Sequence, residues 1–360
     1  MIDAPIKQAN EAYERWLREQ LDGDIVESDL REKWDKMADG PFPFLRATYW
    51  RWAETILDIC PDLAAAPPVL AVGDIHLENF GTWRDDDGRL VWGVNDFDEA
   101  AEMPYPLDLV RLATSAMLAR PSRNFRGKDI SASILEGYER GLKSPRPFVL
   151  DEKRAWLRDL VVVPEAERAQ FWTKMDALKR SKKGPAERYR DAIVGAMPDK
   201  TCEITKFSRR RAGTGSLGRP RWVGIADWHG APVVREAKAL VQSGWTRIPG
   251  RGSPSLRCEE IALGRYRAPD AWYDVIDATV VRRLSPNNRK IEVVDEPDAL
   301  LDPRMLRAMG RELANIHLGT GDARKAIKRD LSRRKRGWLR EAAGDAMKFV
   351  RGEYNEWCQP

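Results

Sequence analysis

The chain changes character twice along its length, and this order of segments most constrains its fold. Residues 5–21 and 27–60 show the apolar spacing of helices, and a helical pattern returns from Pro303 onward. Between them, residues 204–241 combine glycines, β-branched residues and alternation, which predicts a small antiparallel sheet. The sequence therefore predicts an α+β protein with two lobes. The segments assigned to the larger, helical lobe are 1–200 and 296–360, and the smaller, β-rich lobe is 201–295.

Short apolar segments predict further strands within the helical lobe. Val69 to Val72 is bounded by Gly73, as expected of a buried strand. Asp85-Asp86-Asp87-Gly88 is typical of a hairpin turn, and Leu90 to Val94 is the expected returning strand. The remaining elements are expected as helices at 107–118, 130–142, 151–160, 174–198 and 256–267, and as strands at 275–284.

Composition favours a cytoplasmic protein that does not enter a membrane. Hydrophobic residues make up 42% of the 360 residues, which is enough for a sizeable core. No window holds about 18 uninterrupted apolar residues, and the first residues contain no apolar run like that of a signal peptide. The four cysteines lie far apart without a C-x-x-C pair, so we expect free thiols rather than a zinc site or disulfides.

The formal net charge is only +5, but basic residues gather locally. The segment from Arg324 to Arg340 has nine lysines or arginines and a single acid, Asp330. Such a segment could bind the phosphates of nucleic acid. A solvent-facing side of a helix also explains it, and we favour that interpretation over a nucleic-acid partner.

Acidic and amide residues gather at two places, each directly after an expected strand. The first is Gly73-Asp74-Ile75-His76-Leu77-Glu78-Asn79-Phe80-Gly81, and the second is Asn95-Asp96-Phe97-Asp98-Glu99. Phosphoryl transfer depends mainly on positioning and charge neutralisation, and Mg²⁺ prefers carboxylate, amide and water oxygens. An Asp followed five residues later by an Asn matches the catalytic loop of protein kinases, where the two are base and metal ligand.

These spacings predict individual roles. Asp74 is the expected catalytic base, and Asn79 and Asp96 are the expected metal ligands. Asp98 could be a further ligand or a solvated neighbour. His76 could orient Asp74 or contact phosphate, although an ordinary structural hydrogen bond is equally compatible with the sequence.

Two other interpretations of these residues are weaker. Asp and Asn are common in turns and caps, so each residue alone could be structural. Two such clusters directly after strands rarely coincide by chance. Gly-Asp-Ile-His also opens the sites of two-metal phosphoesterases, but those sites need several more histidines. Besides His76, the sequence contains only His229 and His317.

Gly213-Thr214-Gly215-Ser216-Leu217-Gly218 has G-x-G-x-x-G spacing between two strand-like segments. Glycine permits positive φ and a close approach of backbone amides to phosphates. A Rossmann site would require a helix directly after the last glycine, whereas Arg219 to Trp222 has the pattern of a strand. A strand, glycine turn and strand instead cover the nucleotide phosphates in kinases. The residues expected to contact phosphate are Gly213, Gly215, Ser216 and Gly218.

The next expected strand, residues 232–240, supplies cations for nucleotide phosphates. Kinases place a lysine on the third strand and pair it with a glutamate of the following helix. Lys238 is the first candidate and Arg235 the second. Their spacing puts them on opposite faces of a strand, so only one can face a nucleotide. Glu259 or Glu260 is the expected partner, and charges that merely face solvent are the alternative.

These blocks resemble the bacterial domain-of-unknown-function family 2252, over about Pro41 to Asp322. The matching blocks are Pro43 to Arg46, Gly73 to Gly81, Asn95 to Glu99, Leu107 to Leu112, Gly213 to Gly218, Arg235 to Ala237, Arg282 to Leu284 and Leu313 to Asp322. The chain departs from that family's usual Arg-Gly at Arg46-Ala47 and from its Lys-Glu-Ala at Arg235-Glu236-Ala237. The second departure leaves open whether Arg235 or Lys238 contacts phosphate.

The motifs of that family are similar to those of aminoglycoside-kinase-type enzymes, within the protein-kinase-like superfamily. This resemblance implies a phosphotransferase that uses ATP and Mg²⁺ on an unknown hydroxyl acceptor, either a small molecule or a protein. A nucleotide-binding pseudokinase and an AMP-transferring regulatory protein are the alternatives. The resemblance also implies that Asp108 stabilises the catalytic loop and that Arg111 pairs with acids.

The order of the motifs differs from that of ordinary kinases, in which the glycine turn comes first. Here Gly213 follows Asp74 by about 140 residues. We therefore expect a circularly permuted, protein-kinase-like two-lobed fold, in which a helix at Met305–Leu318 packs beside residues 40–120. Such a fold requires the glycine turn to lie close to Asp74.

Overall fold

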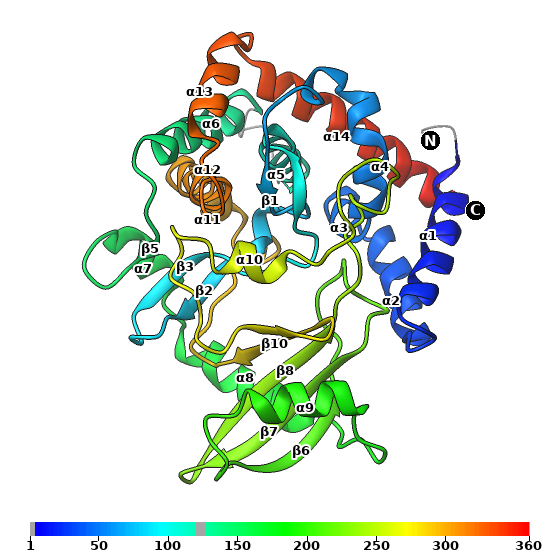
Figure 1. The fold of residues 1–360 in the computed structure, drawn as a ribbon, viewed down its shortest axis with the longest axis vertical. Coiled ribbons are helices and arrows are strands. Elements are labelled where there is room, and N and C mark those ends of the chain that lie inside the picture. The colour runs from blue at the N-terminus through cyan, green and yellow to red at the C-terminus, as the bar shows by residue number, and fades with distance from the viewer. Residues whose placement is uncertain (1–3, 120–126, 360) are drawn as a thin grey trace.

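A computed structural model describes residues 4–119 and 127–359, which form a helical part and a sheet-containing part (Figure 1). The helices of the helical part are α1 (Ile6–Gln20), α2 (Glu27–Ala38), α3 (Pro41–Ala47), α4 (Tyr49–Ile59), α5 (Pro106–Ala119), α6 (Gly127–Lys143), α7 (Ala155–Val161), α11 (Pro297–Leu301), α12 (Pro303–His317), α13 (Arg324–Arg333) and α14 (Trp338–Trp357), with 3₁₀ turns η1 (Pro61–Leu63) and η2 (Leu77–Asn79). The mixed α+β class expected from the sequence is confirmed.

Two small antiparallel sheets lie within the helical part. One pairs β1 (Pro68–Ala71) with β4 (Ala101–Pro104), and the other has the order β2-β3-β5. The strands of the second are β2 (Phe80–Arg84), β3 (Leu90–Val94) and β5 (Phe148–Val149). The loops that follow β1 and β3 meet, because the Asn95 amide donates to the Asn79 carbonyl at 3.1 Å. Residues 73–81 and 95–99 together form what we call the acidic corner.

A five-stranded antiparallel sheet makes up most of the second part, with the order β6-β7-β8-β10-β9. Its strands are β6 (Glu203–Arg209), β7 (Arg221–Trp228), β8 (Ala231–Ala239), β9 (Asp274–Ile276) and β10 (Thr279–Leu284). Residues 213–218, the glycine turn, connect β6 to β7, so the strand, glycine turn and strand expected from the sequence are present. The chain then passes from β10 back to the helical part.

Two helices that the sequence assigns to the helical lobe belong with this sheet. They are α8 (Glu165–Ala177) and α9 (Glu187–Gly195). Met175 of α8 packs in an apolar cluster with Val223 and Val234 of the sheet, and α9 contacts β7, β8 and β10. The predicted boundary at residue 200 is therefore too late. The error arises because these helices are charged and have a narrow apolar face. The sequence of such a helix does not indicate on which lobe that face packs.

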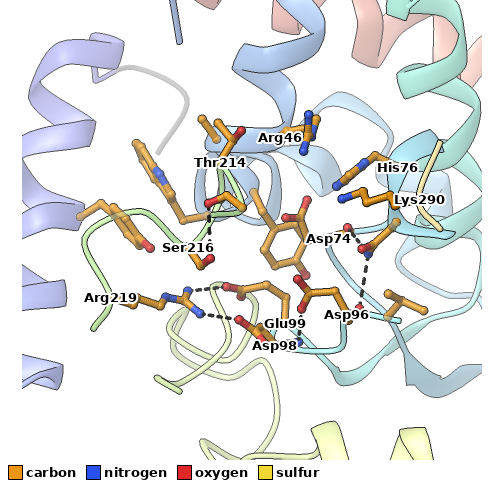
Figure 2. Close-up of a pocket in the computed structure, with 18 residues that line it drawn as sticks. Arg46, Asp74, His76, Asp96, Asp98, Glu99, Thr214, Ser216, Arg219 and Lys290 are labelled. Atoms are coloured by element: carbon orange, nitrogen blue, oxygen red, sulfur yellow. Dashed lines mark hydrogen bonds and ion pairs between the residues drawn. The ribbon is translucent and has the colours of Figure 1, made fainter. Parts of the chain in front are cut away.

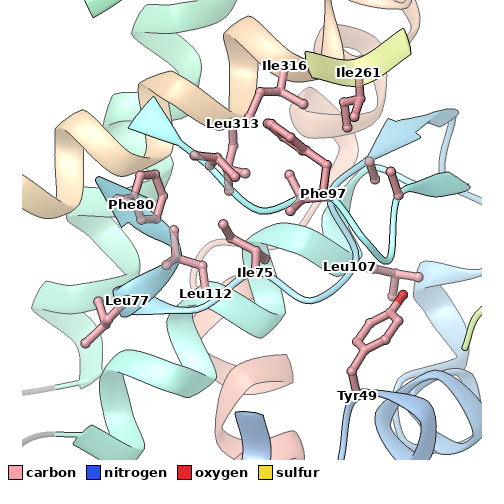
Figure 3. Close-up of a cluster of buried hydrophobic side chains, with 14 of the residues drawn as sticks. Tyr49, Ile75, Leu77, Phe80, Phe97, Leu107, Leu112, Ile261, Leu313 and Ile316 are labelled. Carbon is pink, nitrogen blue, oxygen red and sulfur yellow. The ribbon is translucent and has the colours of Figure 1, made fainter. Parts of the chain in front are cut away.

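Helix α12 lies at the centre of the helical part. It packs on α6 so closely that a Cβ at Gly310 would lie 2.0 Å from the Ile134 carbonyl oxygen. It also contacts β1, β3 and α5, as expected for the predicted helix at 305–318. Figure 3 shows Leu313 and Ile316 of α12 in the same apolar cluster as Phe80 and Phe97.

The two ends of the described chain meet. The Ile6 amide donates to Glu356 Oε1 at 3.1 Å, and Figure 1 shows α1 beside the end of α14. The predicted helices at 151–160 and 256–267 are shorter than expected, because only α7 and α10 (Cys258–Ala262) form there. Among the described helices, none combines the length and the apolar character needed to cross a bilayer.

Candidate active site

Alternating polar and apolar side chains shape the acidic corner. Ile75 and Leu77 are fully buried and pack in the core beneath the loop, as Figure 3 shows. Asp74 and His76 alternate with them and line a cavity. Phe97 is buried in the same core, and the aspartates on either side of it line the same cavity. Burial of every second side chain therefore brings acids from both loops to one place.

Asp108 holds the backbone at the start of the corner. Its carboxylate accepts hydrogen bonds from the amides of Val72 at 2.8 Å and Gly73 at 3.0 Å. It also lies 3.1 Å from His317 Nε2, and His317 Nδ1 lies 2.9 Å from the hydroxyl of Tyr138. All of this network is buried, so Asp108 contacts the start of the loop, as the resemblance implies.

Asp74 forms an ion pair with Arg111, which is completely buried. Arg111 also donates to the Leu45 carbonyl at 2.9 Å. Burial raises the pKa of Asp74 to about 7, although Arg111 opposes the shift. A carboxylate that exchanges its proton near neutral pH is suited to accept one from a hydroxyl group.

Asn79 and Asp96 can supply oxygen ligands for Mg²⁺. The Asn79 side-chain amide donates to the carbonyls of Asp74 at 3.0 Å and Asp96 at 3.4 Å, and its Oδ1 makes no hydrogen bond within the described residues. No group of three histidine, cysteine or acidic side chains in the described residues has the arrangement of a metal site. Mg²⁺ does not need one, since it commonly takes one or two carboxylates and completes its shell with water and phosphate. The side chains present therefore fit Mg²⁺ bound together with a phosphate ligand.

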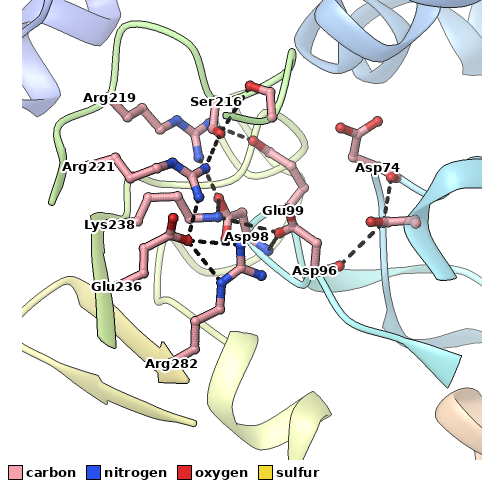
Figure 4. A network of polar contacts seen from close by, with 12 residues as sticks. Asp74, Asp96, Asp98, Glu99, Ser216, Arg219, Arg221, Glu236, Lys238 and Arg282 are labelled. Atoms are coloured by element: carbon pink, nitrogen blue, oxygen red, sulfur yellow. Dashed lines mark hydrogen bonds and ion pairs between the residues drawn. The ribbon is translucent and has the colours of Figure 1, made fainter. Parts of the chain in front are cut away.

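Lys238 points from β8 toward the acids of the corner, as Figure 4 shows. Its Nζ lies 2.5 Å from Asp98 Oδ2 and 3.6 Å from Asp96 Oδ1. Burial would raise the pKa of Asp96, but Lys238 and the nearby Arg282 hold it below its ordinary value. Burial and the neighbouring charge of Asp96 raise the pKa of Asp98. Asp98 is thus occupied by a cation, which leaves Asp96 as the better metal ligand.

Arg219 connects the glycine turn to the corner. It follows the last glycine and lies 2.7 Å from Glu99 Oε1 and 3.5 Å from Asp98 Oδ2. Arg219 was not among the site residues predicted from the sequence. Its position directly after a glycine motif was the available signal, but its acidic partners are about 120 residues away in the sequence.

The glycine turn and the acidic corner line one small cavity, of about 50 Å³ (Figure 2). The contribution of the turn comes from residues 213–216. A Cβ at Gly215 would lie 3.2 Å from Asp74 Oδ2 and 3.0 Å from the Arg46 carbonyl oxygen, so the turn touches the corner. Two regions distant in sequence therefore face each other, with room for a few atoms between them.

Gly218 does not lie where the sequence analysis placed it. Its φ of +96° makes glycine necessary, but the residue packs against Leu30 and Leu17 of the N-terminal helices. Its carbonyl accepts a hydrogen bond from the Val26 amide at 2.9 Å. Gly218 therefore fixes the end of the turn on α2 and does not line the cavity.

Arg235 is not brought to the cavity either. It lies on the face of β8 opposite Lys238, where its Nε donates to the Ala196 carbonyl at 2.6 Å and its guanidinium covers the Trp272 ring. Side chains along a strand alternate between its two faces, so Arg235 points away from the cavity when Lys238 points toward it.

Glu259 and Glu260 do not pair with Lys238. Both are exposed on α10, and Glu260 binds Arg257 at 2.5 Å. The partners of Lys238 are instead acids of the corner. The sequence could not reveal this, because Asp96 and Asp98 are distant from Lys238 along the chain and meet it only in the folded protein.

His76 lines the cavity but makes no hydrogen bond to Asp74 in the described structure. Its Nδ1 accepts a hydrogen bond from the Glu78 amide at 3.2 Å, and its ring meets Phe42 edge-on. Burial lowers the pKa of His76 well below its ordinary value, so the ring is neutral. The local hydrogen bond favours the structural role among those considered for this residue.

Two larger cavities adjoin the first. One, of about 260 Å³, has aromatic and aliphatic walls that include Trp83, Phe97, Tyr273 and Leu284. The other, of about 1170 Å³, lies between α8 and the sheet and has charged walls. Lys290, in the segment after β10, lines all three cavities. Lys290 was not predicted from the sequence, because its position depends on how this segment crosses between the two parts.

The basic segment 324–340 lies on α13 and the start of α14, at the end of the helical part that is away from the five-stranded sheet (Figure 1). Its only acid, Asp330, binds Arg334 at 2.6 Å and also accepts from the Tyr105 hydroxyl. The exposed cations are Lys325, Lys328, Arg329, Arg333, Lys335, Arg336 and Arg340. This is the solvent-facing helix side favoured in the sequence analysis, and a nucleic-acid partner stays untested.

Comparison with known proteins supports one part of the resemblance. Residues 25–147 match the model of a family described as uncharacterized proteins conserved in bacteria, DUF2252. This segment is about a third of the chain and contains the acidic corner, but not the glycine turn. Comparisons with curated proteins and with solved structures gave no match. The family carries no described activity, so a function has to be argued from the geometry.

Proposed function

We propose that this protein is an ATP- and Mg²⁺-dependent phosphotransferase that acts on a hydroxyl acceptor. The observation that carries the proposal is that Asp74, Asn79 and Asp96 share one cavity with the glycine turn. Lys238, on the third strand from the β6 edge, points to the same acids. Protein kinases combine a catalytic Asp, an Asn five residues later, a second metal-binding Asp, a glycine turn and a third-strand lysine.

Each residue has a defined task in this reaction. Asp74 accepts the proton of the acceptor hydroxyl while the hydroxyl oxygen bonds to the γ-phosphorus of ATP. The bond from that phosphorus to the oxygen bridging it to the β-phosphate breaks, and ADP leaves. Asn79 and Asp96 would hold Mg²⁺, which when bound neutralises charge on the phosphates. Arg111 keeps the Asp74 carboxylate oriented through their ion pair.

The cavities suggest how a nucleotide would lie. The 260 Å³ cavity is close to the lower end, about 300 Å³, of typical small-molecule sites, and its aromatic walls suit a planar base. The phosphates would extend toward Asp96. Because Gly215 touches the corner, the glycine turn must move away before phosphates can lie under it. We therefore expect nucleotide binding to be accompanied by movement of residues 213–218.

The same proposal includes a permuted kinase-like fold. Helix α12 is near the end of the chain but packs against β1, which leads into the acidic corner. The two chain ends also meet, as a permuted arrangement requires.

The Asp74→Asn variant tests the proposal. In the presence of Mg²⁺, we expect ATP turnover to fall by about 10²–10⁴-fold, because the group that accepts the proton is removed. Nucleotide affinity should change by less than about threefold, since the metal ligands remain. Turnover is measured with ATP labelled at the γ-phosphate, with water or an added hydroxyl compound as acceptor. Asp87→Asn, in an exposed hairpin turn, is the matched control and should behave as the unaltered protein.

Three outcomes would change the assignment. Failure of the unaltered protein to bind ATP with Mg²⁺ would contradict the proposal. Binding of ATP without any Asp74-dependent turnover would identify a nucleotide-binding pseudokinase. Transfer of label from the α-phosphate, and not from the γ-phosphate, would identify transfer of AMP.

A further inference from the structure

Lys290 occupies the junction of the three cavities. It lies in the segment between β10 and α11, where the chain passes from the sheet back to the helical part. It lines the small cavity with Asp74 and Asp96, and it also lines the aromatic-walled cavity and the large charged one. Figure 2 shows its side chain beside His76 and close to the acidic corner. A ligand that extended from the aromatic walls to Asp96 would pass this ammonium group.

Lys290 differs from the other cations around the corner because it has no partner among the residues that the structure describes. Arg46 binds Glu78 at 2.6 Å, and the other cations that reach the corner also have carboxylate partners. These pairs are Arg111 with Asp74, Arg219 with Glu99, and Lys238 with Asp98 and Asp96. Within the described residues, Lys290 makes no hydrogen bond and no ion pair. A cation without a carboxylate partner is available to an anionic ligand, whereas Lys238 would have to leave two carboxylates.

The backbone that carries Lys290 is held firmly on both sides. The Arg289 amide donates to Thr82 Oγ1 at 2.7 Å, and its carbonyl accepts from the Thr82 amide at 2.9 Å. The Arg289 side chain binds Glu296 at 2.6 Å. On the other side, the Val293 amide donates to Glu78 at 2.9 Å. The side chain of Lys290 is therefore presented from a fixed position, which lowers the entropic cost of binding a ligand.

The surroundings of Lys290 bear charges of both signs. Desolvation within the cleft and the guanidinium of Arg46 lower the pKa of Lys290 to about 8, although solvent in the cavities still reaches the side chain. Glu78, Asp96 and Glu292 oppose this shift. At pH 7 the group is mostly protonated, and it loses its charge as the pH rises through about 8.

We propose that Lys290 binds a phosphate group of the nucleotide, and that Lys238 instead holds Asp96 and Asp98 in position. This inference rests on the proposed function for the identity of the ligand. It assigns the phosphate-binding role to a residue of the connecting segment, not to the third-strand lysine expected from the sequence. A phosphate at Lys290 would lie in or beside the small cavity that Asp96 and Asn79 also line.

Binding of three probes to the full chain tests this assignment. ATP, tripolyphosphate and adenosine are titrated in the presence of Mg²⁺ against the unaltered protein and the Lys290→Gln variant. We expect the variant to bind ATP and tripolyphosphate about tenfold more weakly, and adenosine unchanged within about twofold, because only the phosphates lose a partner. Lys290→Arg should restore most of the lost affinity. Lys174→Gln, a lysine that lines only the large cavity, is the matched control and should leave all three affinities unchanged.

The pH dependence supplies a second readout that a structural role would not produce. ATP affinity of the unaltered protein should weaken between pH 7.5 and about 9.5, and Lys290→Arg should remove this dependence, because arginine stays charged. Equal ATP affinity in Lys290→Gln and the unaltered protein would overturn the inference while leaving the proposed function standing. Absence of ATP binding by the unaltered protein, with tripolyphosphate still bound through Lys290, would overturn the proposed function and support the phosphate role of Lys290.

Discussion

The acidic corner and the glycine turn face the same cavity but are held in place by different means. The corner is anchored by buried apolar side chains such as Ile75 and Leu77, and by hydrogen bonds from its own backbone to Asp108. Polar contacts hold the part of the turn that faces the cavity, whereas its end at Gly218 packs against Leu30 and Leu17. Arg219 binds Glu99, and the Arg221 guanidinium donates to Ser216 at 2.8 Å.

This difference has a functional meaning. Apolar packing and buried backbone hydrogen bonds resist displacement, since any shift leaves cavities or unsatisfied groups. Contacts between a guanidinium and an oxygen can be exchanged for contacts with a phosphate of similar geometry. We therefore expect a corner that keeps its geometry and a turn that moves when a ligand binds.

The largest effect is expected from Asp108→Ala. The change removes the acceptor for two buried backbone amides and leaves His317 without its carboxylate neighbour. At roughly 1–3 kcal/mol for each unsatisfied donor, the free energy of unfolding should fall by about 4 kcal/mol. Urea denaturation measures it, with Asp87→Ala as the exposed control. A loss below about 1 kcal/mol would show that the corner does not depend on this carboxylate.

The same substitution in the two regions provides a direct comparison. At Gly73, with φ of +79°, a Cβ would lie 2.5 Å from the Glu99 carbonyl oxygen and 2.6 Å from the Tyr49 hydroxyl. At Gly215, the closest atoms would be 3.0 Å away, and φ is not positive. Gly73→Ala should cost about 3 kcal/mol, from left-handed strain and overpacking together, and Gly215→Ala about 1 kcal/mol. Equal losses in denaturant unfolding would contradict the difference proposed between corner and turn.

A smaller effect, of opposite sign, is expected from Lys33→Met on α2, the helix that supports the end of the turn. Lys33 is buried, lies 5.0 Å from the centre of the Tyr13 ring and makes no ion pair within the described residues. Burial lowers the pKa of Lys33 to about 8 from its ordinary 10.5. The charged form therefore destabilises the folded state. The loss of free energy of unfolding that this charge causes has its full size below about pH 8. It falls to zero as the pH rises toward 10.5.

Removing that charge should raise the free energy of unfolding by about 2 kcal/mol at pH 7. The gain should vanish near pH 10.5, and denaturation at both pH values measures it. If Lys33→Met were less stable than the unaltered protein at pH 7, the Lys33 ammonium would stabilise the folded state through a favourable contact. The expected destabilising effect of the buried charge would then be wrong.

Most of the elements near the site could be predicted from local patterns. The strand at 69–72, the hairpin around Asp85–Gly88 and the helix at 107–118 all formed close to their predicted bounds. Each depends on neighbours within a few residues, through alternation, turn residues or helical spacing. Failures occurred where distant packing decides. The predicted helix at 256–267 stops at Ala262, and Gly264 beyond it packs against Gly319.

The roles of charged residues were harder to predict than their presence. Strand alternation predicted that only one of Lys238 and Arg235 faces inward, with Lys238 ranked first, and the structure places Lys238 there. The sequence also predicted that Lys238 pairs with a glutamate of the following helix. In the structure Lys238 instead pairs with acids of the corner. Long charged side chains choose partners in space, and several carboxylates of similar chemistry compete for each cation.

By itself, the sequence determined which residues could supply phosphate chemistry and which local elements would carry them. The helical spacing of apolar residues, the turn residues and the alternation of buried and polar side chains act over short distances. They can therefore be recognised in a single sequence. The tertiary structure alone decided that the glycine turn touches Asp74 and that Lys238 is paired with the acids. It also decided that Lys290 lies where the cavities meet, with no partner in the described part of the chain. Those outcomes depend on contacts between segments more than 100 residues apart, and no local pattern encodes them.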